Sequence, residues 1–126
     1  MVKEMDTISG TRMVAMRFNE LAKKEKWFEI QDELFADNVR SVEPSHSMYF
    51  KDEEGKALVR KKGEEWVARV KSANKLSTSE PIVAGSHFAV SRCVDIDVEG
   101  HGHVIINELM LYEVKDGKIV LEQFFY

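Results

Sequence analysis

Two cations interrupt apolar stripes in this sequence. Lys62 falls in a helical stripe with Leu58 and Trp66, and Arg92 interrupts an alternating apolar segment. A long cationic side chain in such a position either extends to water or meets a carboxylate. Buried unpaired charge is unfavourable, so enclosed cations predict acidic partners.

Three acids are the candidate partners. Glu43 precedes a proline, and Glu108 and Glu122 fall on the expected inner face of the last two strands. The set has two interpretations: internal salt bridges that fix the fold, or a polar anchor for a ligand with a carboxylate or carbonyl group. In the second, Lys62 and Arg92 hold the anion. The predicted pocket residues are Phe18, Trp66, Val90, Glu108, Met110, Tyr112, Glu122, Phe124 and Tyr126.

The sequence contains few residues in the patterns that metal sites and catalytic nucleophiles require. Asp95, Asp97 and His103 can approach one another on neighbouring strands, but no complete ligand set at fixed spacing is visible, so we predict no metal. The single cysteine, Cys93, excludes an intramolecular disulfide and is expected to pack as a small apolar group. There is no Gly-x-Ser-x-Gly elbow and no glycine-rich phosphate loop, and we predict no cofactor.

Length and composition restrict the class of protein. The 126 residues predict one domain, 1–126, and 44% apolar with 32% charged residues excludes a disordered chain. The net charge of −4 argues against nucleic acid as a partner, because phosphate binding needs a basic surface. Without a long apolar run or a signal-like start, we expect no membrane association and a cytoplasmic location.

Helical periodicity occupies the first part of the chain. It predicts helices within residues 7–35, interrupted by a solvated lysine-rich run at 23–26, and a third helix over 56–75. Short extended pieces are expected over 39–50, followed by a turn at 52–55.

The period changes to two after Pro81. Alternation predicts strands over 88–98, 103–114 and 118–126, and Asp116-Gly117 is typical of a two-residue hairpin turn. Helices followed by a meander predict an α+β fold, with N-terminal helices packed on a curved mixed or antiparallel sheet.

The outer face of this sheet is also apolar. Ile105, Leu109 and Leu111 fall on the face of strand 103–114 that points away from the helices. Either the sheet is better covered than two layers provide, or a second copy packs against it. We predict a homodimer through this face.

Three segments resemble, in the right order, a known family. The segments Leu34–Pro44, Gly85–Val90 and Leu111–Tyr126 are similar to SnoaL-like proteins of the nuclear-transport-factor-2-like superfamily. The resemblance spans nearly the whole chain. It implies a cone of cystatin-like α+β type: three helices over a curved sheet, with an apolar pocket at the open end. It leaves function open, because this superfamily contains isomerases, cyclases, dehydratases, small-molecule binders and adaptors.

The ketosteroid-isomerase branch of this superfamily suggests a role for Glu43. A motif similar to Phe35-to-Pro44 there ends in an acid-proline pair whose acid is the general base, so the resemblance implies Glu43 as base. The same branch needs an oxyanion hole made by a phenol and a protonated carboxylic acid. The matching positions here are Phe18 and Met110, which donate no hydrogen bond, so ketosteroid isomerisation is not expected.

Two functions remain open from the sequence. The first is binding of, or cofactor-independent acid–base chemistry on, a small apolar molecule, with Glu43 as base and Arg92 or Lys62 as electrostatic stabiliser. The second is a non-catalytic dimerisation or adaptor domain that works through the outer sheet face. An open hollow among the charged groups favours the first function, and a hollow filled by apolar side chains favours the second.

Overall fold

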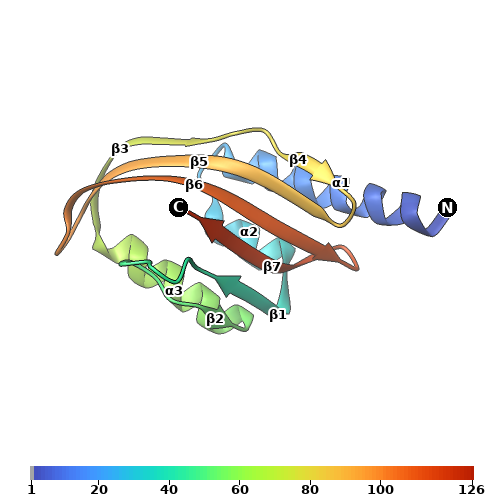
Figure 1. Cartoon of the computed structure of the whole chain (residues 1–126), viewed down its shortest axis with the longest axis horizontal. Helices are drawn as coiled ribbons and strands as arrows, with labels where there is room; N and C mark the ends of the chain where they lie inside the picture. Colours follow the sequence, from blue (N-terminus) through green and yellow to red (C-terminus); the bar gives the residue numbers. More distant parts are fainter. Residues whose placement is uncertain (1) are drawn as a thin grey trace.

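The computed structural model describes residues 2–126, and within them the chain forms three helices and seven strands (Figure 1). The helices are α1 (Val2–Ala22), α2 (Trp27–Leu34) and α3 (Lys56–Arg69). The strands are β1 (Phe35–Val42), β2 (Glu53–Glu54), β3 (Val70–Thr78), β4 (Ile82–Ala84), β5 (His87–Val98), β6 (Gly102–Lys115) and β7 (Lys118–Phe125). The predicted α+β class is confirmed.

All seven strands belong to one mixed sheet. Its order is β2-β1-β7-β6-β5-β3, and β4 also pairs with β5. The β1–β7 pair is parallel and the others are antiparallel. In Figure 1, β5 and β6 curve along the length of the molecule, with α1 and α2 behind the sheet and α3 beside β1.

Two local features of the backbone follow directly from sequence. Asp116 and Gly117 both have positive φ, 51° and 74°, as a tight turn between β6 and β7 requires. The predicted hairpin is therefore confirmed. Gly55, with φ of 93°, immediately precedes α3, where a side chain would strain the backbone.

The helices bury one face of the sheet, and the core divides into two clusters. The larger cluster lies between helices α1 and α2 and the end of the sheet that carries the β6–β7 hairpin. In it, the centroid of the Phe18 ring lies 5.1 Å from that of Phe88 and 4.7 Å from that of Tyr112. The smaller cluster lies at the other end of β5 and β6 and consists of Val94, Ile96, Val98, Val104 and Ile106. Along β6, buried residues alternate with exposed ones.

The third predicted helix is too long. It ends at Arg69, and residues 70–78 form β3, which pairs antiparallel with β5. Leu58, Lys62, Trp66 and Val70 continue the helical spacing into the strand, which explains the error. β3 also lacks the alternation typical of a strand, because seven consecutive residues, 71–77, are exposed on this sheet edge.

The segment between α2 and α3 differs from the sequence prediction. The predicted extended pieces over 39–50 reduce to β1, which starts earlier, at Phe35, and ends at Val42. Hydrogen bonding of β1 to β7 on one side and to β2 on the other fixes it within the sheet. Neither β2 nor β4, each of two or three residues, was predicted.

Candidate functional site

A row of polar side chains crosses the inner face of the sheet between the two core clusters. Thr78 on β3 is the register partner of Arg92 on β5, and Arg92 is the register partner of Glu108 on β6. On either side of Arg92, Val90 belongs to the larger cluster and Val94 to the smaller. With the groups that adjoin this row, we define the polar belt as Ser41, Glu43, Lys62, Thr78, Arg92, Glu108, Glu122 and Tyr126.

Lys62 forms a buried ion pair with Glu43. Its Nζ lies 2.9 Å from Glu43 Oε2, and the two side chains are 13% and 3% exposed. The same ammonium donates to Ser41 Oγ at 2.6 Å and to the carbonyl of Lys51 at 3.3 Å. All three protons of Lys62 therefore have acceptors, as a desolvated ammonium requires. Of the two options for Lys62, the structure shows that it meets a carboxylate.

A continuous chain of hydrogen bonds extends from this ion pair in both directions. On the inner side, Ser41 Oγ donates to Glu122 Oε1 at 2.8 Å. On the outer side, the Tyr126 hydroxyl donates to Glu43 Oε1 at 2.8 Å and lies 2.5 Å from Ser47 Oγ. The chain thus links a buried acid on β7 to the segment that follows β1.

Arg92 pairs with a different acid from the three that the sequence indicated. Its guanidinium makes two hydrogen bonds to Glu25, at 2.8 and 3.1 Å, and one to Thr78 Oγ1 at 2.9 Å. It also lies over the Trp27 ring, 4.5 Å from its centroid. Burial raises the pKa of Glu25, but hydrogen bonds from Arg92 and Trp27 outweigh that effect and lower it below 4.5. The turn between α1 and α2 is therefore clamped to β5.

Glu108 is the belt carboxylate without a partner. It makes no hydrogen bond or ion pair with any residue that the structure describes, although Arg92 is its register neighbour. Burial raises its pKa to about 7; Arg92 lowers it, and the charges of Glu43 and Glu122 raise it. Glu108 thus exchanges a proton near neutral pH.

Glu122 also titrates near neutrality, but one of its oxygens accepts a hydrogen bond from Ser41. Burial raises its pKa to about 7, against the lowering effects of the Ser41 hydrogen bond and the Lys62 charge. Burial likewise raises the pKa of Tyr126, which remains a neutral hydrogen-bond donor at physiological pH. The belt therefore combines two carboxyl groups with pKa values of about 7, one ion pair and one phenol.

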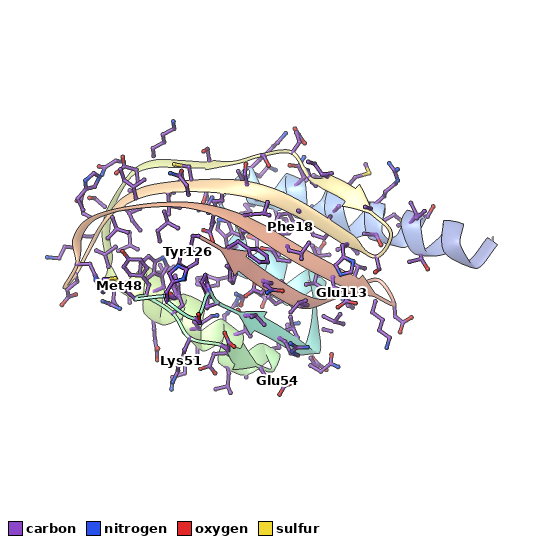
Figure 2. The ribbon with its side chains drawn as sticks, viewed as in Figure 1. Phe18, Met48, Lys51, Glu54, Glu113 and Tyr126 are labelled. Carbon is purple, nitrogen blue, oxygen red and sulfur yellow. The ribbon has the colours of Figure 1, made fainter. Side chains whose placement is uncertain are left out.

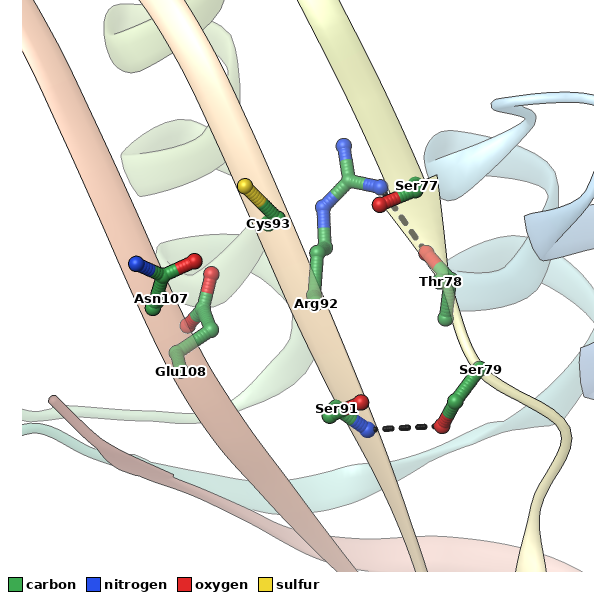
Figure 3. Close-up of a pocket in the computed structure, with 8 residues that line it drawn as sticks. All are labelled: Ser77, Thr78, Ser79, Ser91, Arg92, Cys93, Asn107 and Glu108. Carbon is green, nitrogen blue, oxygen red and sulfur yellow. Dashed lines mark hydrogen bonds between the residues drawn. The ribbon is translucent and has the colours of Figure 1, made fainter.

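Two hollows, both open to solvent, border the polar belt. The sheet hollow, of about 500 Å³, lies on β3, β5 and β6 (Figure 3). Its lining comes from both faces of these strands and consists of Ser77, Thr78, Ser79, Ser91, Arg92, Cys93, Asn107 and Glu108. The lid hollow, of about 660 Å³, lies between α3 and the segment 47–53 and includes Lys62. Both volumes fall within the range of small-molecule sites, ~300–1,000 Å³.

Most of the predicted pocket residues form the core instead of the wall of a hollow. Glu108 lines the sheet hollow and Trp66 the lid hollow. The members of the larger core cluster are Phe18, Val90, Met110 and Tyr112. Phe124 packs against that cluster, and Tyr126 packs against the smaller one. Figure 2 shows Phe18 farther along the sheet than Tyr126, Met48 and Lys51, which lie near the lid hollow.

The outer face carries the remaining polar cluster. His103 Nε2 lies 2.5 Å from Asp95 Oδ1, and Asn74 Nδ2 donates to both Asp95 and Asp97. Within residues 2–126, no group of three or more His, Cys, Asp or Glu side chains is arranged to hold a metal ion. Cys93 is a half-buried free thiol.

Three belt contacts could not be predicted from sequence. Ser41 gives no sequence signal, because a serine on a strand is ordinary until its neighbours are known. Glu25 belongs to a run that looked fully solvated, and Tyr126 was expected to cover a ligand rather than to donate to Glu43. The apolar character of a tyrosine ring hides the role of its hydroxyl.

The chain belongs to the SnoaL-like domain family, whose model matches residues 9–126. The predicted resemblance is therefore confirmed. No curated protein matches the chain. Within residues 2–126, no helix is both long and apolar enough to cross a membrane.

Solved structures share the fold. A candidate SnoaL-like polyketide cyclase from Mesorhizobium loti is 29% identical, with a TM-score of 0.85 over 91% of this chain and 97% of that one. A candidate ketosteroid isomerase from Kribbella flavida is 22% identical, with a TM-score of 0.63 over 94% of this chain and 78% of that one. TerC, crystallised with polyporic acid, is 12% identical, with a TM-score of 0.68 over 93% and 91%.

Proposed function

We propose that this protein binds a small, largely apolar molecule beside the polar belt and removes a proton from it without a cofactor. The observation that carries the proposal is Glu108: a half-buried carboxyl group, without a hydrogen-bond partner, in the lining of the sheet hollow. General acid–base catalysis needs a group whose pKa lies near the working pH and whose oxygens are free to reach the substrate.

We assign a separate role to each of three belt residues. Glu108 acts as the base. Lys62 and Arg92, held by Glu43 and Glu25, supply fixed positive charge near the negative charge that develops on the substrate. Because both cations already bind carboxylates, they act through their field rather than as open anchors for an anion.

Glu43 stays the second candidate for the base, as the family resemblance implies. Both of its oxygens already accept hydrogen bonds, from Lys62 and Tyr126. It can take a proton from a substrate only if one of these donors moves aside. Glu108 needs no such rearrangement, which is why we favour it.

Proton abstraction can be tested without knowing the natural substrate. The probe is 2-tetralone, an apolar ketone whose α-hydrogens exchange with D₂O, followed by NMR. We expect the wild-type protein to accelerate exchange, with a rate that rises through about pH 7 as Glu108 loses its proton, and Glu108→Gln to reduce the acceleration about 100-fold. Glu99→Gln, with the same charge change in an exposed turn, serves as the control and keeps the wild-type rate.

The same experiment separates the two bases. If Glu43→Gln loses the accelerated exchange and Glu108→Gln keeps the wild-type rate, the base is Glu43 and our choice is contradicted. Equal rates for wild type and both variants contradict proton transfer at the belt altogether.

The outer face supports a second candidate function, dimerisation. Ile105, Leu109 and Phe125 are 56%, 46% and 46% exposed there, and Leu109 and Phe125 are direct cross-strand neighbours. We propose that a second copy of the chain covers this patch, as an adaptor or dimerisation domain would require.

Light scattering after gel filtration tests the dimer. We expect a dimer for the wild type and a monomer for Leu109→Glu, because an unpaired carboxylate in an apolar interface is strongly unfavourable. Leu58→Glu, on α3, places the same charge at a similarly exposed leucine and leaves the dimer intact. A monomeric wild type contradicts this proposal.

A further inference from the structure

The lid hollow combines an aromatic floor with an excess of positive charge. The rings of Tyr49, Phe50 and Trp66 line it, with the Phe50 and Trp66 centroids 4.6 Å apart and the Tyr49 and Trp66 centroids 5.8 Å apart. Each of these side chains is half-buried, so each ring keeps part of its surface open to the hollow. Aromatic surface of this kind binds flat apolar groups.

Four cations and two acids line the same hollow. The cations are Lys51, Lys61, Lys62 and Arg69, and the acids are Glu53 and Glu65. Lys62 is unavailable to a ligand, because its three protons are accepted by Glu43, Ser41 and a carbonyl. The positive charge that a ligand can meet therefore comes from the other three.

Those three cations are weakly engaged. Lys51 and Lys61 lie 3.9 and 4.0 Å from Glu53 and Glu65, and Lys51 and Lys61 are highly exposed. Contacts of this kind contribute ~0–1 kcal/mol, so a ligand carboxylate can compete for them. Arg69 donates to the carbonyl of Glu99 and forms no ion pair with a carboxylate within the described residues. A guanidinium in this state offers paired donors that match a carboxylate.

We infer that the lid hollow is a second binding site, separate from the base at Glu108, for an aromatic carboxylate. The aryl group lies against Phe50 and Trp66, and the carboxylate meets Arg69. Charge complementarity selects the anion: without the engaged Lys62, three basic and two acidic side chains line the hollow, whereas the whole chain has a net charge of −4. The inference does not depend on the proton transfer proposed above.

Calorimetry with sodium 2-naphthoate as the probe tests the site on the full chain. We expect binding to the wild type, at least about fivefold weaker binding of the neutral analogue 2-naphthalenemethanol, and at least about fivefold weaker naphthoate binding by Arg69→Gln. Lys71→Gln is the matched control: it removes one positive charge from exposed β3, outside the hollow, and changes the affinity less than about twofold.

Two further variants keep the outcome decisive. Phe50→Ala weakens both probes, because both use the aromatic floor. Glu108→Gln binds naphthoate like the wild type, so that failure of the proton-transfer proposal and failure of this site give different results. Arg69→Lys keeps the charge but lacks the paired donors, so it recovers part of the affinity that Arg69→Gln loses and shows that this loss comes from the cation.

Three results overturn the inference. The first is absence of naphthoate binding at about 5 mM, a concentration above the ~1 mM dissociation constant of a weak site. The second is equal affinity for naphthoate and for the alcohol. The third is equal loss of naphthoate affinity in Arg69→Gln and Lys71→Gln.

Discussion

The two faces of β5 and β6 shift the pKa of a carboxyl group in opposite directions. On the inner face, Glu108 is half-buried and its pKa rises to about 7, chiefly because of burial. On the outer face of the same strands, Asp95 is also half-buried, but its pKa falls below 3.8 because His103 and Asn74 donate hydrogen bonds to it. The residue type is nearly the same, so the environment decides which carboxylate can act as a base at neutral pH.

The contrast extends to ion pairs. The inner pair of Lys62 and Glu43 is almost completely enclosed, whereas the pair of Arg17 and Glu33 is close to half exposed. Only the enclosed pair has lost its hydration and depends on its partner for compensation. The variants below are ordered from the largest expected effect to the smallest.

Replacing Lys62 by Met should have the largest effect. The change leaves Glu43 buried beside the apolar core with one donor, Tyr126, and removes the donor to Ser41. We expect the free energy of unfolding to fall by about 3–5 kcal/mol, measured by urea unfolding followed by circular dichroism. Lys61→Met, one residue earlier on the exposed side of α3, should change it by less than about 0.5 kcal/mol. Equal losses in the two variants would contradict a buried ion pair.

Replacing Glu122 by Gln should change how stability depends on pH. The folded-state pKa of Glu122 is about 7, above its ordinary value of 4.5, so the folded protein holds a proton that the unfolded chain releases between these values. Stability is therefore lost as the pH rises through this window. The glutamine removes that loss and still accepts from Ser41.

The expected gain of Glu122→Gln is roughly 1–3 kcal/mol at about pH 8 and shrinks towards about pH 4.5. Urea midpoints at several pH values measure it. The Glu108 carboxyl leaves a residual slope of the same sign. A gain that stays constant with pH would point to packing instead of titration.

Replacing His103 by Gln should have the smallest effect. Its pKa is raised by the hydrogen bond and charge of Asp95, so the stabilisation is present below its ordinary value of 6.5 and is lost as the pH rises through the raised value. The pair is exposed, and solvent and salt screen it. We expect the melting temperature at about pH 8 to stay within about 1 °C of the wild type. A larger shift would show that the outer cluster carries more than surface charge.

The fold was largely predictable because the burial of one face of an element places apolar residues at regular intervals in its sequence. The alternation in β5, β6 and β7 and the Asp116-Gly117 turn gave the meander, since one face of each strand is buried. β3 gave no such pattern, because an edge strand exposed on both faces places no periodic demand on its residues.

The site was predictable only in its unusual members. Lys62, Arg92 and Glu108 were identified because a charge inside an apolar stripe requires an explanation. Their partners were not, because pairing depends on which strands become neighbours: Ser41 approaches Glu122 only through the parallel β1–β7 pair. A carboxylate without a partner, such as Glu108, cannot be recognised until every neighbouring donor is placed.

That parallel pair has a consequence for biosynthesis. Ser41 and Glu122 are 81 residues apart, and Glu43 and Tyr126 are 83 apart. A nascent chain can make the helices and the Lys62–Glu43 contact early, but Ser41 and Glu43 lack their last acceptor and donor until β7 leaves the ribosome tunnel. The hydrogen-bond network around Ser41 and Glu43 is thus completed only after β7 is made, and until then the edge of β1 that pairs with β7 is open.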